Sequence, residues 1–311
     1  MAPIPGGSFD IEQFTGNNAL DRVPPILTYT NVAPHPARFA NYNDLNMYLP
    51  TREGDELVLG EPIFIAHNCL GSCQHSGGPA STVTRDGKTY IVWGEISPDD
   101  APGVPTYVAT VDHATRTVGE KVLLGYGPPV NDVHNVPAIT MDSAGYLHVL
   151  IGAHGQPFGY VRSLTPGDAY GGWTERVDAL SAGRITDDSD EDGFGLQTYI
   201  SLVCGPDDAL HSAFRQWRQG PDEHIPGTNF AALSVQRRPA DGEWGYSIYS
   251  HKRTVDRAGN LYLSYSHWTS DNTYQDDFPG RYEHMAVVVS RDGGVTWKLV
   301  ETSDFEQAVI R

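Results

Sequence analysis

The chain has 311 residues, of which 39% are hydrophobic and 10% aromatic, with 33 glycines and 22 prolines. This aromatic content excludes a disordered chain, and the many turn-forming residues exclude a helical bundle. The formal net charge of -18 opposes binding to the phosphate backbone of nucleic acids. No run of about 18 apolar residues is present, so we expect no membrane-spanning helix. All-β propellers and barrels often exceed 200 residues as one unit, so we expect one large all-β domain over residues 1–311.

A segment rich in cysteine and histidine precedes the first clear repeat. His67-Asn-Cys69-Leu-Gly-Ser-Cys73-Gln-His75 has the residue types of a zinc site, but its spacing matches no standard zinc finger. Cys69 and Cys73 could pair or stay reduced, and Cys204 is left over. We expect a disulfide or a plain turn here rather than a metal.

Four copies of a strand–turn–strand pattern follow, in which an alternating apolar strand enters an Asp/Gly turn and an aromatic-rich strand leaves it. The copies are Ala80 to Gly94, Ala138 to Gly152, Ile200 to Phe214 and Lys252 to Ser266. Their turn aspartates Asp86, Asp142, Asp207 and Asp256 lie 56, 65 and 49 residues apart. This spacing is close to one propeller blade of about 40 to 50 residues.

Each copy is followed by a further strand pair, such as Thr106 to Asp112 with Thr117 to Leu124, which completes a four-stranded blade. The predicted fold class is therefore an all-β propeller of four-stranded antiparallel blades. Four clear blades, together with about 75 leading residues, predict roughly five blades. The acidic run Asp187 to Asp192 lacks the ligand alternation of an EF-hand loop, so we interpret it as a solvated loop between blades.

The last copy ends with Ser290-Arg-Asp-Gly-Gly-Val-Thr-Trp297. This segment resembles the Asp-box of sialidase-type propellers, in which the Asp and Gly residues form a tight turn and the Trp packs between blades. It supports the fold and says little about function. Trp217, Trp244 and Trp268 either stack on sugar rings or pack between blades, and packing is the more common role.

Candidate functional residues follow from the antiparallel geometry, because residues equidistant from a hairpin turn become neighbours. His134 and His154 each lie ten residues from the turn near Ala144. Tyr199 and Arg215 each lie eight residues from the turn at Asp207. We expect these four side chains on one face of the propeller. A single such residue is more often structural, but four at related positions favour function.

Further residues are predicted on the same face as substrate-binding groups. They are His75 and Glu95 from the preceding blade, His267 from the following blade, and Arg253, Arg281 and His284 from nearby loops.

These residue types suit β-elimination next to a uronic acid. Arg215 with a histidine can hold the carboxylate and stabilise the negative charge that develops in the transition state. A neutral histidine or a deprotonated tyrosine can remove the C5 proton, and a tyrosine or histidine can return a proton to O4. Hydrolysis ordinarily requires two carboxylates, and no Asp/Glu pair occupies the mirror positions.

The segments Asp132-Val-His134-Asn-Val-Pro-Ala, Asp142-Ser-Ala-Gly-Tyr-Leu-His-Val and Gly152-Ala-His154-Gly resemble the BNR-repeat propeller polysaccharide lyases. That family includes ulvan lyases and lyases that cut rhamnose from glucuronate in arabinogalactan-type gums. The resemblance runs from about Gly77 to Trp297.

The resemblance implies a seven-bladed propeller, so the closing blades are expected to be missing from the C-terminal end. It also implies a metal-independent chemical step that uses His134, His154, Tyr199 and Arg215 as catalytic residues. Members differ over whether a His or the Tyr is the base, so these roles stay open. No cofactor is then required for the chemistry, although the sequence leaves room for a structural calcium or zinc ion.

The predicted function is thus a polysaccharide lyase that cleaves the O4 bond to glucuronate or iduronate, beside rhamnose as in ulvan or arabinogalactan gum. The alternatives are a non-catalytic carbohydrate-binding propeller and a sialidase-like hydrolase. The expected partner is an anionic polysaccharide, with no nucleic acid, no membrane and a monomeric chain. A secreted or periplasmic location follows from the substrate class alone, since no signal peptide is visible.

Overall fold

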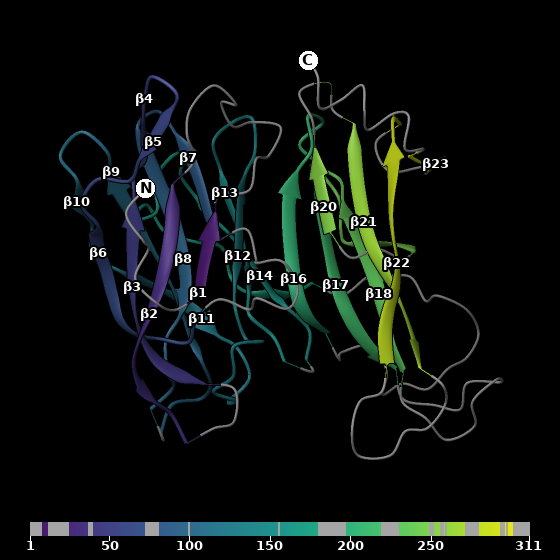
Figure 1. Ribbon diagram of the computed structural model, residues 1–311, viewed down its shortest axis with the longest axis horizontal. Coiled ribbons are helices and arrows are strands. Elements are labelled where there is room, and N and C mark those ends of the chain that lie inside the picture. Colours follow the sequence, from purple (N-terminus) through teal and green to yellow (C-terminus); the bar gives the residue numbers. More distant parts are fainter. Residues whose placement is uncertain are drawn as a thin grey trace.

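The computed structural model describes residues 8–11, 25–36, 40–71, 81–98, 100–154, 156–179, 197–218, 230–248, 252–255, 258, 260–270, 280–292, 296 and 298–300. These residues form β-strands and turns (Figure 1). Within them, no helix is long and apolar enough to cross a membrane.

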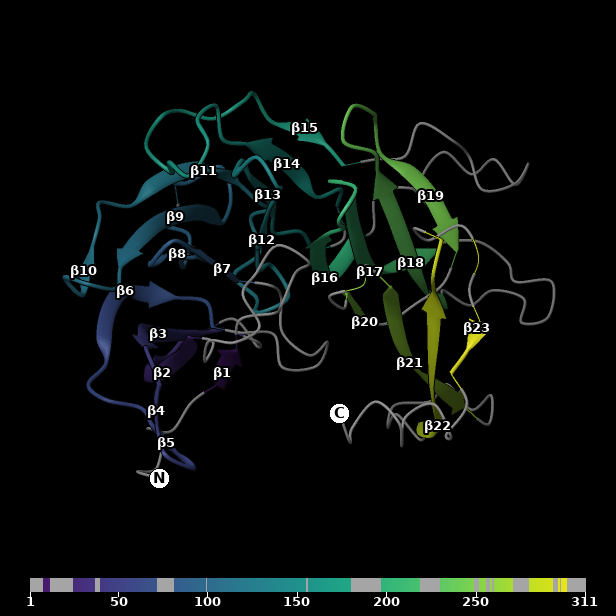
Figure 2. The same cartoon turned by 90° about the horizontal axis from the view of Figure 1, so that it is seen from above.

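Five antiparallel sheets of four or five strands fan out around a common middle (Figure 2), and one further sheet has two strands. In the second to fifth sheets the first strand lies toward the middle and the last toward the outside. Each of these five sheets is therefore a propeller blade, as the sequence predicted. The first blade contains β1 (Ser8–Ile11), β2 (Ile26–Pro34), β3 (Asn41–Tyr48) and β6 (Ile63–Cys69), and the hairpin β4 (Thr51–Glu53) and β5 (Glu56–Val58) is inserted before β6.

The other four blades begin with the four predicted hairpins. The second blade contains β7 (Thr82–Arg85), β8 (Lys88–Gly94), β9 (Pro105–Asp112), β10 (Thr117–Val118) and β11 (Val122–Tyr126). The third contains β12 (Ala138–Met141), β13 (Leu147–Ile151), β14 (Gly159–Arg162) and β15 (Val177–Asp178). The fourth contains β16 (Gln197–Cys204), β17 (Leu210–Arg218), β18 (Phe230–Arg238) and β19 (Gly245–Ile248). The fifth contains β20 (Lys252–Val255), β21 (Leu261–Ser270), β22 (Gly280–Ser290) and β23 (Lys298–Leu299).

The predicted outer strand Thr117 to Leu124 differs in detail, because two strands, β10 and β11, both pair with β9. The Asp-box prediction is confirmed at its turn between β22 and β23. There the Asp292 carboxylate accepts a hydrogen bond from the Ser290 hydroxyl at 2.7 Å and from the Thr296 backbone N–H at 2.8 Å. Trp297 lies outside the described residues.

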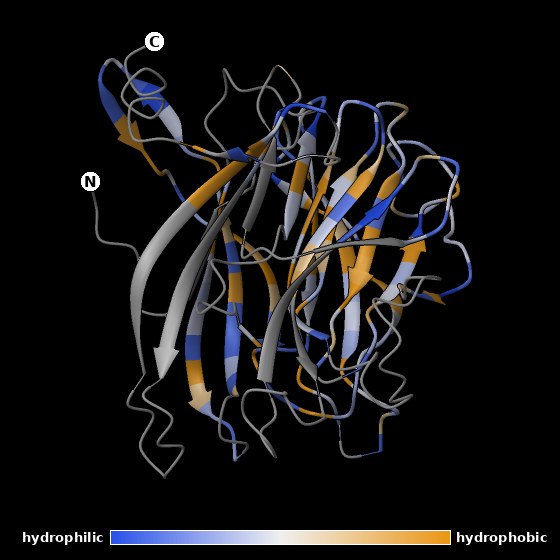
Figure 3. Cartoon of the chain, turned by 90° about the vertical axis from the view of Figure 1, so that its right-hand side faces the viewer, coloured by the Kyte–Doolittle hydropathy of each residue, from blue (hydrophilic) through white to orange (hydrophobic). Residues whose placement is uncertain are grey.

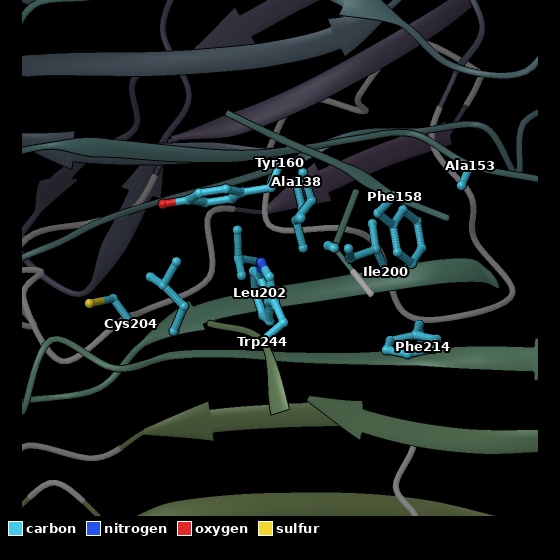
Figure 4. Close-up of a cluster of buried hydrophobic side chains, with 12 residues drawn as sticks. Ala138, Ala153, Phe158, Tyr160, Ile200, Leu202, Cys204, Phe214 and Trp244 are labelled. Carbon is cyan, nitrogen blue, oxygen red and sulfur yellow. The ribbon is translucent and has the colours of Figure 1, made fainter. Parts of the chain in front are cut away.

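The hydrophobic core consists of apolar layers between neighbouring blades, so inner strands such as β12 and β13 are buried on both faces. Figure 3 shows bands of hydrophobic and hydrophilic residues along the described strands. The layer between the third and fourth blades contains Phe158 and Tyr160 from one side, and Phe214 and Trp244 from the other (Figure 4). Trp244 therefore packs between blades, whereas the side chains of Trp217 and Trp268 lie outside the described residues.

Polar contacts also join successive blades at their turns. Arg85 of the second blade donates to the Ser143 carbonyl oxygen of the third at 3.1 Å. Ser143 in turn donates its backbone N–H and its hydroxyl to the Asp208 carboxylate of the fourth blade, at 2.7 and 2.6 Å. These bonds fix the relative position of the three blades that surround the predicted site.

A buried Asp–His–Tyr network lies inside the third blade. His148 has one ring nitrogen 2.7 Å from the Tyr160 hydroxyl and the other 3.1 Å from the Asp142 carboxylate. Burial lowers the pKa of His148 below its ordinary value, and the positive charges of Arg162 and Arg238 act in the same direction, whereas Asp142 opposes them. For Asp142, burial acts to raise the pKa, but hydrogen bonds from His148 and the Tyr146 N–H outweigh it and lower the pKa.

Both shifts predict that this blade loses stability in acid. Below the unfolded-state pKa of His148, about 6.5, the unfolded chain takes up a proton that the folded chain excludes, so stability falls as pH falls. Asp142 adds to the loss at still lower pH, because its stabilisation disappears as pH falls through its lowered pKa.

We expect the free energy of unfolding to drop between pH 6.5 and 5 by at most about 1.4 kcal/mol per pH unit from His148. Urea unfolding across this range measures the slope. His148→Gln, which cannot titrate, should flatten the slope, and an unchanged slope in that variant would contradict the assignment.

Candidate active site

His134 and His154 flank the same hairpin at the same end. In the β12–β13 pair, Ala138 faces Leu150, so the chain before β12 and the chain after β13 emerge side by side. His134 lies four residues before Ala138 and His154 four residues after Leu150. Their ring centroids are 5.0 Å apart with an interplanar angle of 13°, which is a stacked pair. The predicted mirror relation is confirmed for these two residues.

Asn135 anchors the loop that carries His134. Its side chain is fully buried, and its amide donates to the carbonyl oxygens of Pro128 at 2.9 Å and Val130 at 3.3 Å. Gly152, at the start of the loop that carries His154, lies directly against the Asn135 backbone. The two histidine loops therefore touch through Asn135 and Gly152, and this contact leaves no space for a side chain.

Gly152→Ala is expected to disrupt this contact. An added Cβ would lie 2.6 Å from the carbonyl carbon and oxygen of Asn135, a separation that requires the backbone to move. Overpacking of this kind costs about 1–3 kcal/mol, and here it would also separate His134 from His154. The measurements are urea unfolding and the activity of the folded fraction. Gly54→Ala is the comparison, because Gly54 has open space around it and its φ of 63° makes any loss of stability there a cost of backbone strain and not of overpacking.

Tyr199 occupies a strained position in β16, where a β-bulge interrupts the pairing with β17. Thr198, and not Tyr199, faces Arg215, so the predicted mirror pair Tyr199–Arg215 is wrong by one residue. The extra residue gives Tyr199 a φ of 61°, which is uncommon for a bulky side chain. Strained residues of this kind concentrate at functional sites.

The Tyr199 strand is tied to the His154 loop by Gln197. The fully buried Gln197 side chain accepts a hydrogen bond from the Phe158 backbone N–H at 2.8 Å. Phe158 also packs edge-on against Phe214 of the fourth blade, with ring centroids 5.7 Å apart. These contacts place Tyr199 of the fourth blade beside His134 and His154 of the third.

Tyr199, His134 and Asp132 form a continuous hydrogen-bonded network. The Tyr199 hydroxyl is 2.6 Å from Nε2 of His134. Nδ1 of His134 is bonded to Oδ1 of Asp132, which also accepts the His134 backbone N–H at 2.8 Å. Asp132 was not among the predicted site residues. The available signal was an acidic residue two positions before a histidine within one loop.

His154 completes the group, with its Nδ1 3.8 Å from Oδ2 of Asp132. Side-chain exposure rises through the network, from 8% for Asp132 and 11% for His134 to 31% for His154. The carboxylate is thus the inner end of the site, and His154 is the more accessible of its two histidines.

The Asp132 carboxylate is ionised in this setting and fixes the tautomer of His134. Burial alone would raise the pKa of Asp132, but hydrogen bonds from the ring and backbone of His134, together with the charges of His134 and His154, lower it below the ordinary value. An ionised carboxylate only accepts hydrogen bonds, so Nδ1 of His134 carries the proton. In the neutral ring, Nε2 then accepts the Tyr199 hydroxyl, and it can take up that proton.

Of the other predicted site residues, the structure describes the side chain of Glu95 alone. The Glu95 carboxylate contacts Nζ of Lys121 at 2.7 Å and the Trp93 ring N–H at 3.0 Å, so it is engaged by its own blade. His75 lies outside the described residues, and so do the side chains of Arg215, Arg253, His267, Arg281 and His284. The substrate-binding role of these residues stays a prediction.

The structure also bears on metal ligands. Cys69 is a free thiol that is fully buried, and burial raises its pKa well above the ordinary value. The His67 ring is 69% exposed and binds Asp44 at 2.8 Å, so His67 and Cys69 lie in different environments. In the described part of the chain, one group of three potential ligands has its atoms within 4.8 Å of one another: Asp132, His134 and His154.

Several solved structures are similar to this chain. The polysaccharide lyase Uly1 matches with 12% identity over 79% of this chain and 58% of its own, at a TM-score of 0.47. An ulvan lyase bound to -[GlcA(1-4)Rha3S]- matches with 14% identity over 71% of this chain and 46% of its own, at a TM-score of 0.43. An α-L-arabinanase from Cellvibrio cellulosa matches with 12% identity over 98% of both chains, at a TM-score of 0.41.

This chain spans about half the length of the two lyases. The matched proteins include lyases and hydrolases, so these likenesses do not distinguish between the two reactions. No curated protein has a significant sequence match to the chain. A family model for BNR repeat-containing proteins matches residues 88–310, which cover most of the chain and include His134, His154 and Tyr199. The chain therefore belongs to the BNR repeat-containing family.

Proposed function

We propose that this protein is a polysaccharide lyase that cleaves the C4–O4 bond to glucuronate or iduronate by β-elimination, beside rhamnose as in ulvan or arabinogalactan gum. The observation that supports this most directly is the Tyr199 hydroxyl 2.6 Å from Nε2 of His134, with Asp132 on the opposite side of the ring. A tyrosine held in this way can pass its proton to the histidine and take it back.

In the proposed reaction, His134 holds the proton of Tyr199 while the phenolate oxygen removes the C5 proton of the uronate. The C5–H electron pair forms the C4=C5 double bond, and the C4–O4 bond breaks. The leaving O4 oxygen takes a proton from the Tyr199–His134 pair, which is restored for the next cycle. Asp132 stabilises the imidazolium form of His134 throughout, as a carboxylate does in other hydrogen-bonded triads.

His154 has a different proposed role. Its side chain is more exposed than those of His134 and Asp132, and its Nδ1 lies 3.8 Å from the Asp132 carboxylate. We assign to it, together with Arg215, the binding of the uronate carboxylate. Neutralising this group stabilises the negative charge that develops at C5.

Hydrolysis is the main alternative, and the site supports it less well. A glycoside hydrolase needs a protonated carboxyl group as its general acid. Asp132 is bonded to His134 and has a lowered pKa, so it is unsuited to donate a proton near neutral pH.

We further propose that the protein acts outside the cytoplasm, where such polymers occur.

Ultraviolet absorbance tests the proposal, because an unsaturated uronate absorbs and a hydrolysis product does not. Wild-type protein is incubated with ulvan, gum arabic and other glucuronate polymers, alongside His134→Ala and Arg215→Ala, with His67→Gln as the control away from the site. A rise with one polymer that the two site variants abolish supports the lyase and names its substrate. New reducing ends without absorbance would establish a hydrolase, and binding without cleavage would establish a binding propeller.

A further inference from the structure

We propose that Asp132, His134 and His154 form an inhibitory binding site for a divalent transition-metal ion of the zinc class. Binding of the ion is independent of the proposed lyase activity, whereas its inhibitory effect rests on that activity.

The ligand set is suitable for such an ion. Zinc binds imidazole nitrogen and carboxylate oxygen at about 2.0–2.2 Å, and sites with three protein ligands leave a fourth position for water. Two neutral imidazoles and one ionised carboxylate provide these donors, and their ligand atoms lie within 4.8 Å of one another. Two ligands of one tetrahedral ion are separated by about 3.4 Å at these bond lengths. Oδ2 of Asp132 and Nδ1 of His154, at 3.8 Å, need to move only a few tenths of an ångström.

His134 would join the site through Nδ1. The ion takes the place of the Nδ1 proton, the neutral ring then carries its proton on Nε2, and the Nδ1 contact with Oδ1 of Asp132 is exchanged for a bond to the metal. Nε2 of His134 still faces the Tyr199 hydroxyl, 2.6 Å away. The stacked arrangement of the two histidine rings, with 13° between their planes, brings both Nδ1 atoms to the same carboxylate.

Access and charge also favour the ion. The inner ligands Asp132 and His134 are nearly buried, and His154, with 31% exposure, provides an open side. The net charge of -18 raises the local concentration of cations around the protein.

Two other Asp–His contacts among the residues that the structure describes lack a third ligand and serve as internal comparisons. Asp142 and His148 are joined by Tyr160, a poor zinc ligand in its protonated form, and His148 is almost fully buried. Asp44 and His67 form an exposed pair. Only the Asp132 group supplies three donors among the described residues.

Inhibition follows from the bond to Nδ1. A metal at this atom withdraws electron density from the ring and removes the contact with Asp132 that stabilises the imidazolium form. His134 then no longer accepts the Tyr199 proton, and the proposed proton exchange stops. A chelator should restore the exchange.

Calorimetric titration of the full chain with zinc chloride tests the site, and cobalt(II) chloride provides a visible spectrum that reports coordination. We expect His154→Gln to weaken zinc binding by at least about 10-fold, since the loss of even an outer partner of a metal ligand costs about 10-fold to 100-fold. His67→Gln should bind zinc at this site as the wild type does. Circular dichroism establishes that both variants are folded.

Equal zinc affinity and equal cobalt spectra for wild type and His154→Gln would overturn the site. Zinc binding that depends on His154 but leaves lyase activity unchanged would overturn the inhibition alone. If the metal-free protein shows no lyase activity while zinc binding still depends on His154, the proposed function fails and the metal site stands.

Discussion

Tyr199→Phe is expected to lower kcat by about 10²-fold to 10⁴-fold, the range that a positioned general acid–base group contributes. The hydroxyl removed is the one that lies 2.6 Å from Nε2 of His134, and no other atom of the ring is lost. Because the aromatic ring remains, KM should change much less than kcat. Initial rates of absorbance increase over a range of polymer concentrations separate the two parameters.

Tyr160→Phe is the matched control. Tyr160 also bonds a histidine through its hydroxyl, at 2.7 Å from His148, but this contact is buried inside the blade. Its loss should lower the free energy of unfolding by about 1–3 kcal/mol, because a buried hydrogen-bonding group of His148 is left unpaired. The kcat of Tyr160→Phe should match wild type. Equal kcat in Tyr199→Phe and wild type would contradict the role of Tyr199.

Asp132→Asn should produce a loss of similar size, about 10²-fold to 10⁴-fold in kcat, through a different cause. The amide that replaces the carboxylate can donate to Nδ1 of His134, which moves the ring proton to Nε2. Nε2 would then donate to the Tyr199 oxygen and could no longer accept its proton. In a comparable triad, the same kind of substitution costs about 10⁴-fold.

Asp132 acts through His134, so its test must separate positioning from folding. We expect KM and the midpoint of thermal unfolding to change little while kcat falls, because Nε2 of His134 then donates to Tyr199 instead of accepting its proton. Asp44→Asn provides the comparison, since Asp44 bonds His67 at 2.8 Å on the surface. A parallel loss of stability and activity in Asp132→Asn would assign Asp132 a structural role only.

The blade pattern could be predicted from the sequence because each hairpin carries its own signals. Alternating apolar residues and an Asp/Gly turn fix the register, so the pairing of Ala138 with Leu150 followed from the position of the turn. His134 and His154 lie beyond the ends of these paired strands, and the same register places them together. Local chemistry was sufficient at this hairpin.

The remainder of the site depends on features that the sequence does not display. A β-bulge adds one residue to a strand without changing its composition, so the displacement of Tyr199 relative to Arg215 was not visible in Gln197 to Cys204. Asp132 lies in a loop with no periodicity, and its contact with His134 depends on how Asn135 folds that loop. Contacts between blades required the structure.

The proton network crosses from the third blade to the fourth, since Asp132 and His134 precede β12 and Tyr199 belongs to β16. The blade is the repeated unit of a propeller, and a single blade of this protein carries an incomplete network. The smallest part of the chain that carries the whole network is therefore a pair of adjacent blades. Transplanting residues 132–248, which span the third and fourth blades, into another propeller would preserve the network, whereas moving the third blade alone would leave His134 without its tyrosine.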